Sequence, residues 1–288
     1  MTDPDKPPAI VEIIRFLQTQ TGTVCRPPQP GDRVGFSLMS KDRVSFTRQT
    51  LKAMDRDAGY DIVWNDGSDE AEGRALPGDF RFRNARLVEV NYDVRGGPDA
   101  GICFGLKRLL DLGYDYVGLI ENDIVMNRGW FRQLMNLFKL AADDGLVCGA
   151  ATVRSYGHRV IEHRSGYSIN WTTGAGMILF TRSAAEVVLR RYLQLSMTRA
   201  AMMHFYARLF RLDLKLADLS NPNGGGSTHL TYDWGYTPML YMHGFMSAGS
   251  IPSLARDLQY PPGHYLLNDY VQAGHNNAGL ARPRTASP

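Results

Sequence analysis

The sequence has few cysteines and no long apolar run. Its three cysteines, Cys25, Cys103 and Cys148, are widely separated, so they provide neither the CxxC spacing of a zinc site nor the even number of a disulfide framework. No stretch approaches the roughly 18 uncharged apolar residues that a membrane-spanning helix requires. We therefore expect a reducing, cytoplasmic compartment and a chain that is soluble or only peripherally attached to a membrane.

Neither sign of charge is in large excess. The chain has 32 basic and 29 acidic residues, a formal net charge of +3, and no long run of either sign, which argues against a nucleic-acid partner. The opening residues, MTDPDKPPAI, place acids and prolines where a secretory signal has a basic start and an apolar core. We therefore expect no signal peptide.

The sequence also lacks two common nucleotide-binding loops. The first predicted strand, at residues 33–38, leads into SLMSKDR, which contains neither GxGxxG nor GxxxxGK followed by Ser or Thr. This excludes typical dinucleotide-binding dehydrogenases and P-loop enzymes. A sugar nucleotidyltransferase remains an alternative, although it would normally carry a Gly-rich loop with Arg and Lys here, and only Lys41 and Arg43 are present.

Strand-like apolar runs alternate with helix-length segments through most of the chain. The predicted strands are residues 33–38, 60–64, 86–90, 116–120, 145–153 and 176–181. The predicted helices are residues 44–54, 100–113, 129–142 and 183–193, the last beginning with Ser183 and Glu186 as a capping box. This alternation predicts an α/β fold with a single Rossmann-like mixed sheet and helices on both faces.

The segments outside this alternation are interpreted separately. Residues 1–32 are predicted to form a short helix, which RPPQPGD ends, and a linker. Residues 33–275 are predicted to form a single catalytic domain, and residues 276–288 a disordered tail. The Met-rich and aromatic-rich stretch 197–211 is predicted to be a helix with an apolar and a basic side. Such a helix either packs over the core or lies on an anionic membrane.

Two predicted strands end in polar clusters. NDGSD, residues 65–69, follows the second strand, and END, residues 121–123, follows the fourth. Ligands of open α/β sheets bind beyond the carboxyl ends of the strands, although either cluster alone is also compatible with a solvated turn. As a pair they favour a ligand site, in which Asp66 accepts a hydrogen bond from a base and Gly67 permits close approach of backbone.

The second cluster offers oxygen ligands. Glu121 and Asp123, expected to alternate along extended chain, suit a ribose hydroxyl and a divalent cation that bridges two phosphates. Mg²⁺ or Mn²⁺ is the cation that such carboxylates favour.

In their order along residues 33–250, these motifs resemble the family-two nucleotide-sugar glycosyltransferases with the A-type fold. The resemblance is carried by the following segments: RVGFSLMSKDRVSFTRQTLKAM for the first strand and helix, NDGSD for a nucleotide-reading DGSxD, RGGPDAGICFGL for a Gly-rich segment, LIENDIVMNRGWF for a DxD strand, TGAGMILFTRSAAEVV for an acceptor-side strand and helix, and YDWGY for the catalytic acid. The ordered set, rather than any one motif, carries the resemblance.

The resemblance implies a role for each polar cluster. Ser37, Asp66, Gly67 and Glu121 are expected to bind the nucleotide, with Asp66 at the base and Glu121 at the ribose, and Asp123 is expected to ligate the metal. Glu121 departs from the family pattern, which has Asp at that position.

The Gly-rich segment departs from the pattern as well. Ile102 and Cys103 stand where related enzymes often carry Arg-Asn, so the diphosphate is expected to bind elsewhere, at Arg95. The glycines of this segment, Gly96, Gly97 and Gly101, are equally compatible with the binding role that the resemblance implies and with a flexible loop plus close helix packing.

Three further residues are candidates from the same resemblance. Asp233 is the expected general base of an inverting transfer, although its position before the apolar segment WGYTPMLYM also suits a helix N-cap, and the two roles are compatible. Trp171 is expected to contact the acceptor, and otherwise to be a half-buried core residue. His264 is expected to complete the metal shell, and otherwise to be structural.

Taken together, these residues predict a metal-dependent, inverting glycosyltransferase. The donor is expected to be a UDP-sugar or GDP-sugar, with Mg²⁺ or Mn²⁺ as cofactor and an acceptor that the motifs do not specify. A sugar nucleotidyltransferase and a non-catalytic nucleotide-binding or carbohydrate-binding protein with the same fold are the alternatives.

Overall fold

The computed structural model describes residues 10–24, 26–94, 97–154, 160–170, 173, 176–191 and 239–258. The helices are α1 (Ile10–Thr21), α2 (Val44–Met54), α3 (Ala71–Asp79), α4 (Gly97–Asp111), α5 (Trp130–Asp143) and α6 (Arg182–Arg191). The strands are β1 (Val34–Ser40), β2 (Asp61–Asp66), β3 (Arg86–Asn91), β4 (Tyr116–Glu121), β5 (Ile124–Met126), β6 (Cys148–Thr152), β7 (Val160–Arg164), β8 (Tyr167–Asn170), β9 (Met177–Thr181), β10 (Met246–Ser250) and β11 (Ala255–Asp257).

One mixed sheet organises the chain. Its nine strands follow the order β3-β2-β1-β4-β9-β6-β10-β8-β7, and β5 pairs with β11 in a separate two-stranded sheet. Strands β3, β2, β1 and β4 are parallel, whereas β9 is antiparallel to both of its neighbours and β8 is antiparallel to β10 and β7. The predicted α/β fold with a mixed sheet is confirmed.

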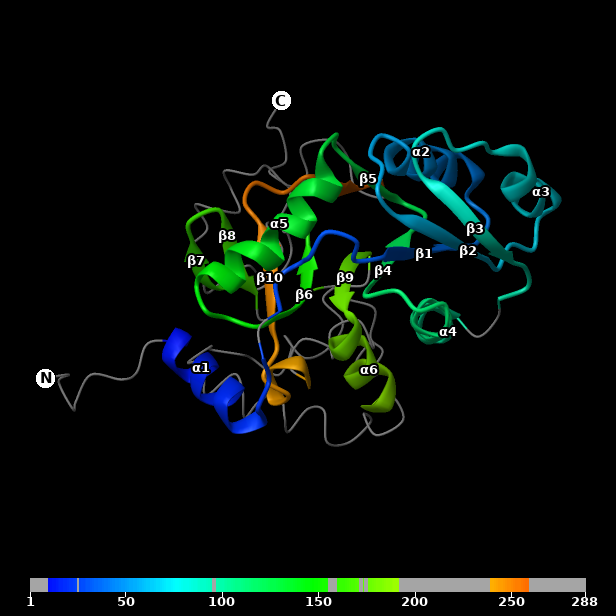
Figure 1. Cartoon of the computed structure of the whole chain (residues 1–288). Coiled ribbons are helices and arrows are strands. Elements are labelled where there is room, and N and C mark those ends of the chain that lie inside the picture. The colour runs from blue at the N-terminus through cyan, green and yellow to red at the C-terminus, as the bar shows by residue number, and fades with distance from the viewer. Residues whose placement is uncertain are drawn as a thin grey trace, which may run out of the picture.

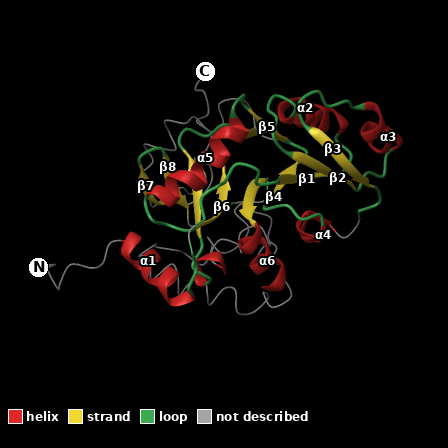
Figure 2. Cartoon of the chain, in the orientation of Figure 1, coloured by secondary structure: helices red, strands yellow, loops and turns green. Residues whose placement is uncertain are grey.

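Helices cover both faces of this sheet. Figure 1 shows α2, α3 and α5 on one side and α4 and α6 on the other, and Figure 2 shows the same division by secondary structure. The strand residues alternate between two cores: Tyr116 and Ile120 of β4 pack with α2 and α5, whereas Val117 and Leu119 pack with α4 and α6. This period of two is what a sheet buried on both faces requires.

Helix α4 lies unusually close to β1. A Cβ atom on Gly105 would come within 2.2 Å of Ser37 Oγ, and one on Gly35 would come within 2.8 Å of a Leu109 methyl group. Small residues on both elements therefore permit the contact. Gly105, in the Gly-rich segment, is thus required for close helix packing.

Helix α1 packs on the same body as the sheet. Ile14 is buried in the core beside α5, and the Arg15 guanidinium donates a 2.7 Å hydrogen bond to the carbonyl of Asp144 at the end of α5. The segment after it is also attached, because Thr23 Oγ1 donates to the carbonyl of His243 at 2.7 Å. No helix of the described ranges is long and apolar enough to cross a membrane.

Several short elements were not predicted. Helix α3 contains Pro77 and two glycines, residues that disfavour a helix interior, and β10 has the small, polar sequence MSAGS. Strand β10 is buried along its whole length, whereas α3 buries only Gly73, Leu76 and Pro77. The predicted capping box is wrong: α6 begins at Arg182, and Thr181 Oγ1 accepts the hydrogen bond from Ala184 N, while Glu186 pairs with Arg182.

Candidate functional site

The loop between β1 and α2, residues 41–43, connects the carboxyl ends of several strands. The backbone N–H of Asp42 donates to Ser68 Oγ at 2.9 Å, and Asp42 Oδ1 accepts 3.0 Å hydrogen bonds from the N–H groups of residues 69–70. Asp42 and Arg43 have positive φ angles of 48° and 49°, a conformation that costs free energy in residues other than glycine. The bonds to the loop after β2 hold this turn in place.

Asp66 is the last residue of β2, and only 1% of it is exposed. Its Oδ1 atom accepts hydrogen bonds from Ser40 Oγ at 2.9 Å, Ser68 Oγ at 2.6 Å and Ser68 N at 3.3 Å. Its Oδ2 atom is also buried and has no hydrogen-bond partner within the described residues. A buried carboxylate oxygen without a donor is costly, so this atom is well suited to accept a hydrogen bond from a ligand.

A buried tryptophan orients the hydroxyl beside Asp66. Trp64 Nε1 donates to Ser40 Oγ at 2.8 Å, which leaves the Ser40 hydroxyl proton directed at Asp66 Oδ1. The carboxylate is therefore fixed at one oxygen by a relay of buried donors. The other oxygen keeps a defined position as a result.

Glycine is required at position 67 because the backbone that follows β3 lies very close to it. Its N–H donates to the carbonyl of Ser40 at 2.8 Å, and a Cβ atom at this position would come within 2.7 Å of the carbonyl oxygen of Val94. The carbonyl of Asp66 in turn accepts a 3.1 Å hydrogen bond from Val94 N. Close packing within the chain therefore requires glycine at this position, and its role in a nucleotide site stays a prediction.

The carboxyl end of β4 carries the second acidic cluster. Glu121 is the last residue of β4, and its N–H donates to the carbonyl of Gly176 at 3.0 Å. Residues 122–123 form a turn between β4 and β5 rather than the extended chain that we expected. The reason is that β5 starts at Ile124 and pairs with β11, which draws the chain away from the main sheet.

Asn122 fixes the turn against the first loop. Its side-chain amide donates to Thr47 Oγ1 at 2.9 Å and to the carbonyl of Asp42 at 3.4 Å. The loop after β1 therefore contacts the polar clusters after both β2 and β4. Three strand ends meet at this loop.

Asp123 is buried beside a cation. Its side chain is 4% exposed, and its Oδ2 atom lies 3.3 Å from the guanidinium of Arg43, whose side chain is 54% exposed. The sequence patterns connect Arg43 only with the nucleotidyltransferase alternative. Its distance of 80 residues from Asp123 along the chain explains why no local pattern indicates the pair.

A second cation lies near Glu121. Arg154 forms a salt bridge with Asp257, with its two donor nitrogens 3.1 and 2.6 Å from Oδ2, and both side chains are mostly buried. A Cβ atom on Gly176 would lie 3.5 Å from the Arg154 guanidinium and 3.6 Å from Glu121 Oε2. The start of β9 therefore brings Arg154 and Glu121 to the same place. Neither Arg154 nor Asp257 was predicted, because their sequence surroundings carry no motif.

Ser37 lies apart from these clusters. It is fully buried in the middle of β1, where its hydroxyl accepts a 2.7 Å hydrogen bond from the Asn65 side-chain amide beneath Gly105. The structure gives it a packing role between β1 and α4. Four other predicted residues, Asp66, Gly67, Glu121 and Asp123, lie at the carboxyl edge of the sheet.

Four predicted residues lie outside the described residues: Arg95, Trp171, Asp233 and His264. The whole 197–211 stretch and the whole 276–288 tail lie outside them as well. Within the described ranges, no three His, Cys, Asp or Glu side chains come together as a metal-binding group. Asp123 and Glu121 offer carboxylate oxygens of the kind that Mg²⁺ and Mn²⁺ prefer, so these two residues fit as ligands of a divalent cation.

Comparisons with known proteins add little to this geometry. No protein-family profile and no curated protein matches the sequence. Among solved structures, the chain matches a mannosyltransferase from Pyrobaculum calidifontis in complex with GDP-Man and Mn²⁺, with a TM-score of 0.38 and 14% identity over 61% of this chain and 54% of that one. It also matches TarS of S. aureus, with a TM-score of 0.39 and 10% identity over 54% of this chain and 29% of that one.

The chain therefore spans about half the length of the first of these proteins and less than a third of the second. Similarity at this level carries no argument about function, which must rest on the residues of this chain.

Proposed function

We propose that the chain is a glycosyltransferase that transfers a sugar from a nucleotide-diphosphate donor to an acceptor hydroxyl. The observation that carries the proposal is the buried Asp66 carboxylate, which has one oxygen fixed by Ser40 and Ser68 and the other without a donor among the described residues. It lies at the carboxyl edge of a parallel part of the sheet, where α/β proteins bind ligands. An imide or amino N–H of a nucleotide base supplies the missing donor.

Other residues are assigned to bind the ribose and the diphosphate of the donor. Glu121, half-buried at the end of β4, is assigned to a ribose hydroxyl, and Arg95 to the diphosphate. Asp123, with Glu121 nearby in sequence and His264 as a further ligand, is assigned to a divalent cation. Such a cation, when bound, would neutralise charge on the diphosphate. Arg43, which already lies beside Asp123, balances the charge of that carboxylate.

The transfer itself is assigned to Asp233 and Trp171. Asp233 takes the proton of the acceptor hydroxyl as that oxygen attacks the anomeric carbon from the face opposite the nucleotide, so the configuration inverts. Trp171 offers an apolar face to the acceptor sugar ring.

The nucleotidyltransferase alternative has less support. Its basic residues would have to bind phosphates in the loop after β1, but Lys41 Nζ lies 3.2 Å from Asp69 Oδ2 and Arg43 pairs with Asp123. Both cations of this loop therefore have carboxylate partners.

The first test of the proposal is turnover. The chain is incubated with Mn²⁺ and a panel of UDP-, GDP- and ADP-sugars, and release of the nucleoside diphosphate is measured.

Asp233→Asn should lower turnover by roughly 10²–10⁴ with donor affinity unchanged, because Asn keeps the size of Asp but does not accept the proton. A residue that only caps a helix behaves differently: Asn caps as well as Asp, so rate and stability would both be retained. A product of retained configuration by NMR would also contradict the inverting mechanism.

The second test concerns the metal. Asp123→Asn removes a charge without changing shape, so it should weaken the Mn²⁺-dependent part of nucleoside-diphosphate binding, measured by calorimetry with and without Mn²⁺. The unfolding transition reports whether the loss of the Arg43 partner alters the fold. Equal Mn²⁺ dependence in the variant and the wild type would remove Asp123 from the metal site.

A further inference from the structure

A second candidate site lies beside the C-terminal end of α2. A cleft of about 660 Å³ opens there, a volume within the range of small-molecule sites. The charged residues that line it are five cations and one acid: Lys52, Arg56, Arg81, Arg83, Arg128 and Asp55. Because the chain as a whole is nearly balanced in charge, this concentration of cations is local.

The cations of the cleft are not neutralised by acidic partners. Within the part of the chain that the structure describes, none of the five forms a salt bridge, whereas Lys41, Arg86 and Arg108, for example, do. Arg56 and Arg81 donate to backbone carbonyls, Arg56 to Met126 at 2.8 Å and Arg81 to Phe80 at 3.2 Å. A guanidinium has five N–H donors, so these bonds fix both groups and leave donors for a ligand.

The acidic side chains of this region accept hydrogen bonds from backbone N–H groups. The Asp55 carboxylate accepts hydrogen bonds of 2.8 to 3.2 Å from the N–H groups of residues 83–85, and the Asp57 carboxylate accepts bonds of 3.0 and 3.1 Å from Gly129 and Phe131. These bonds order the two loops that carry Arg83 and Arg128. The acids thus position the cations rather than pair with them.

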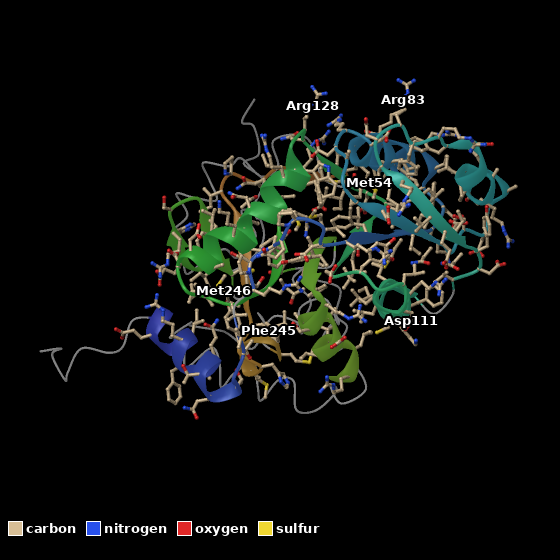
Figure 3. The ribbon with its side chains drawn as sticks, in the orientation of Figure 1. Met54, Arg83, Asp111, Arg128, Phe245 and Met246 are labelled. Atoms are coloured by element: carbon tan, nitrogen blue, oxygen red, sulfur yellow. The ribbon has the colours of Figure 1, made fainter. Side chains whose placement is uncertain are left out.

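The cleft is separate from the proposed donor site. Helix α2 begins next to Arg43 at the carboxyl edge of the sheet, and its 11 residues carry the chain about 16 Å to its other end, where the cleft lies. In Figure 3 the side chains of Arg83 and Arg128 project from the same side of the molecule, above α2 and the start of α5, while Asp111 marks the opposite side.

We propose that this cleft binds the phosphate group of an anionic ligand. Guanidinium groups match the geometry of phosphate oxygens, and several converging cations favour an anion of more than one charge. Hydrogen bonds to backbone carbonyls account for Arg56 and Arg81. They do not account for Lys52, Arg83 and Arg128, which are exposed and make no described side-chain hydrogen bond. The phosphate belongs either to a lipid headgroup or to a soluble phosphorylated molecule.

The test compares two variants of equal charge change. The cleft variant carries Lys52→Gln, Arg83→Gln and Arg128→Gln, and the control carries Lys107→Gln, Lys139→Gln and Arg190→Gln, three exposed cations outside the cleft. Binding of pyrophosphate is measured by calorimetry without divalent cations. Binding to vesicles of equal parts phosphatidylglycerol and phosphatidylcholine is measured by sedimentation. Thermal unfolding verifies that each variant is folded, and Arg83→Gln alone replaces the triple variant if that one is not.

We expect the cleft variant to lose at least about tenfold in affinity for one probe while the control keeps the wild-type value, and the wild-type affinity to fall as salt is added. Loss for vesicles alone identifies a lipid headgroup, and loss for pyrophosphate alone identifies a soluble phosphate. The proposal is overturned if the wild type binds neither probe, if the cleft variant binds as the wild type does, or if the control loses as much. None of these outcomes depends on glycosyltransferase activity.

Discussion

The two ends of strand β2 carry the same residue in opposite settings. Asp61, at the amino end, receives hydrogen bonds from Arg86 Nε at 2.7 Å, from Arg86 Nη2 at 2.5 Å and from the Tyr114 hydroxyl at 2.6 Å, so that both of its oxygens are occupied. Asp66, at the carboxyl end, receives all of its described bonds at one oxygen, from hydroxyl and amide donors, and no cation pairs with it there.

The difference separates a structural carboxylate from a candidate binding carboxylate. Burial alone would raise the pKa of Asp61, but the hydrogen bonds from Arg86 and Tyr114 and the charge of Arg86 outweigh it and lower that pKa. Burial, together with the hydrogen bond to Asp61, raises the pKa of Tyr114 to about 12, so this hydroxyl remains a donor at neutral pH. At the amino end of β2, both oxygens of Asp61 are thus hydrogen-bonded within the chain. At the carboxyl end, Asp66 Oδ2 is available to accept a hydrogen bond from a ligand.

Asp66→Ala tests the binding half of this comparison and should have the largest effect. Loss of a charged acceptor should reduce affinity for the preferred nucleoside diphosphate by about 1.5–3 kcal/mol. The free energy of unfolding should change by no more than about 1 kcal/mol, because removing an incompletely paired buried charge offsets the lost hydrogen bonds. Calorimetry with UDP, GDP and ADP and denaturant unfolding measure the two quantities. An unchanged preference among the three nucleotides, with a large loss of stability, would make Asp66 structural like Asp61.

Gly67→Ala tests whether the carboxyl end depends on close backbone contact. The new Cβ atom would meet the Val94 carbonyl oxygen at 2.7 Å, so the loop must shift, at a cost of about 1–2 kcal/mol in unfolding free energy. Gly78→Ala is the matched control, since no atom lies within 4 Å of its Cβ position in α3, and it should be neutral or stabilising. Equal stability of the two variants would show that the contact does not constrain the loop.

Asp61→Asn should have the smallest effect. The ion pair is partly solvated, since the side chain of Arg86 is 70% exposed, so its loss should cost about 1 kcal/mol or less at neutral pH. Because the folded pKa of Asp61 lies below its unfolded value of about 3.9, its contribution is complete above that pH and is lost as the pH falls towards the folded pKa.

Unfolding curves of the wild type and Asp61→Asn should therefore converge in acid, below about pH 4. Parallel curves across that range would mean that Asp61 does not lose its pairing there, and the contrast with Asp66 would weaken.

The sequence alone determined the layered fold and the position of the acids. Short continuous apolar runs such as residues 116–120, separated by helix-length segments, indicate a sheet buried on both faces, and such a pattern is local, so it can be read without the structure. The polar clusters at residues 65–69 and 121–123 were assigned to strand ends for the same reason. Their functional roles remain predictions.

Only the tertiary structure decided which charges meet. Arg43 and Asp123 are 80 residues apart, Arg154 and Asp257 are 103 apart, and the cations of the cleft come from three separate segments. These partners depend on strand order and on loops such as 41–43, whose positive φ angles no local propensity predicts. An ion pair depends on where its two side chains lie in space. A local sequence pattern therefore carries no information about a partner that is distant along the chain.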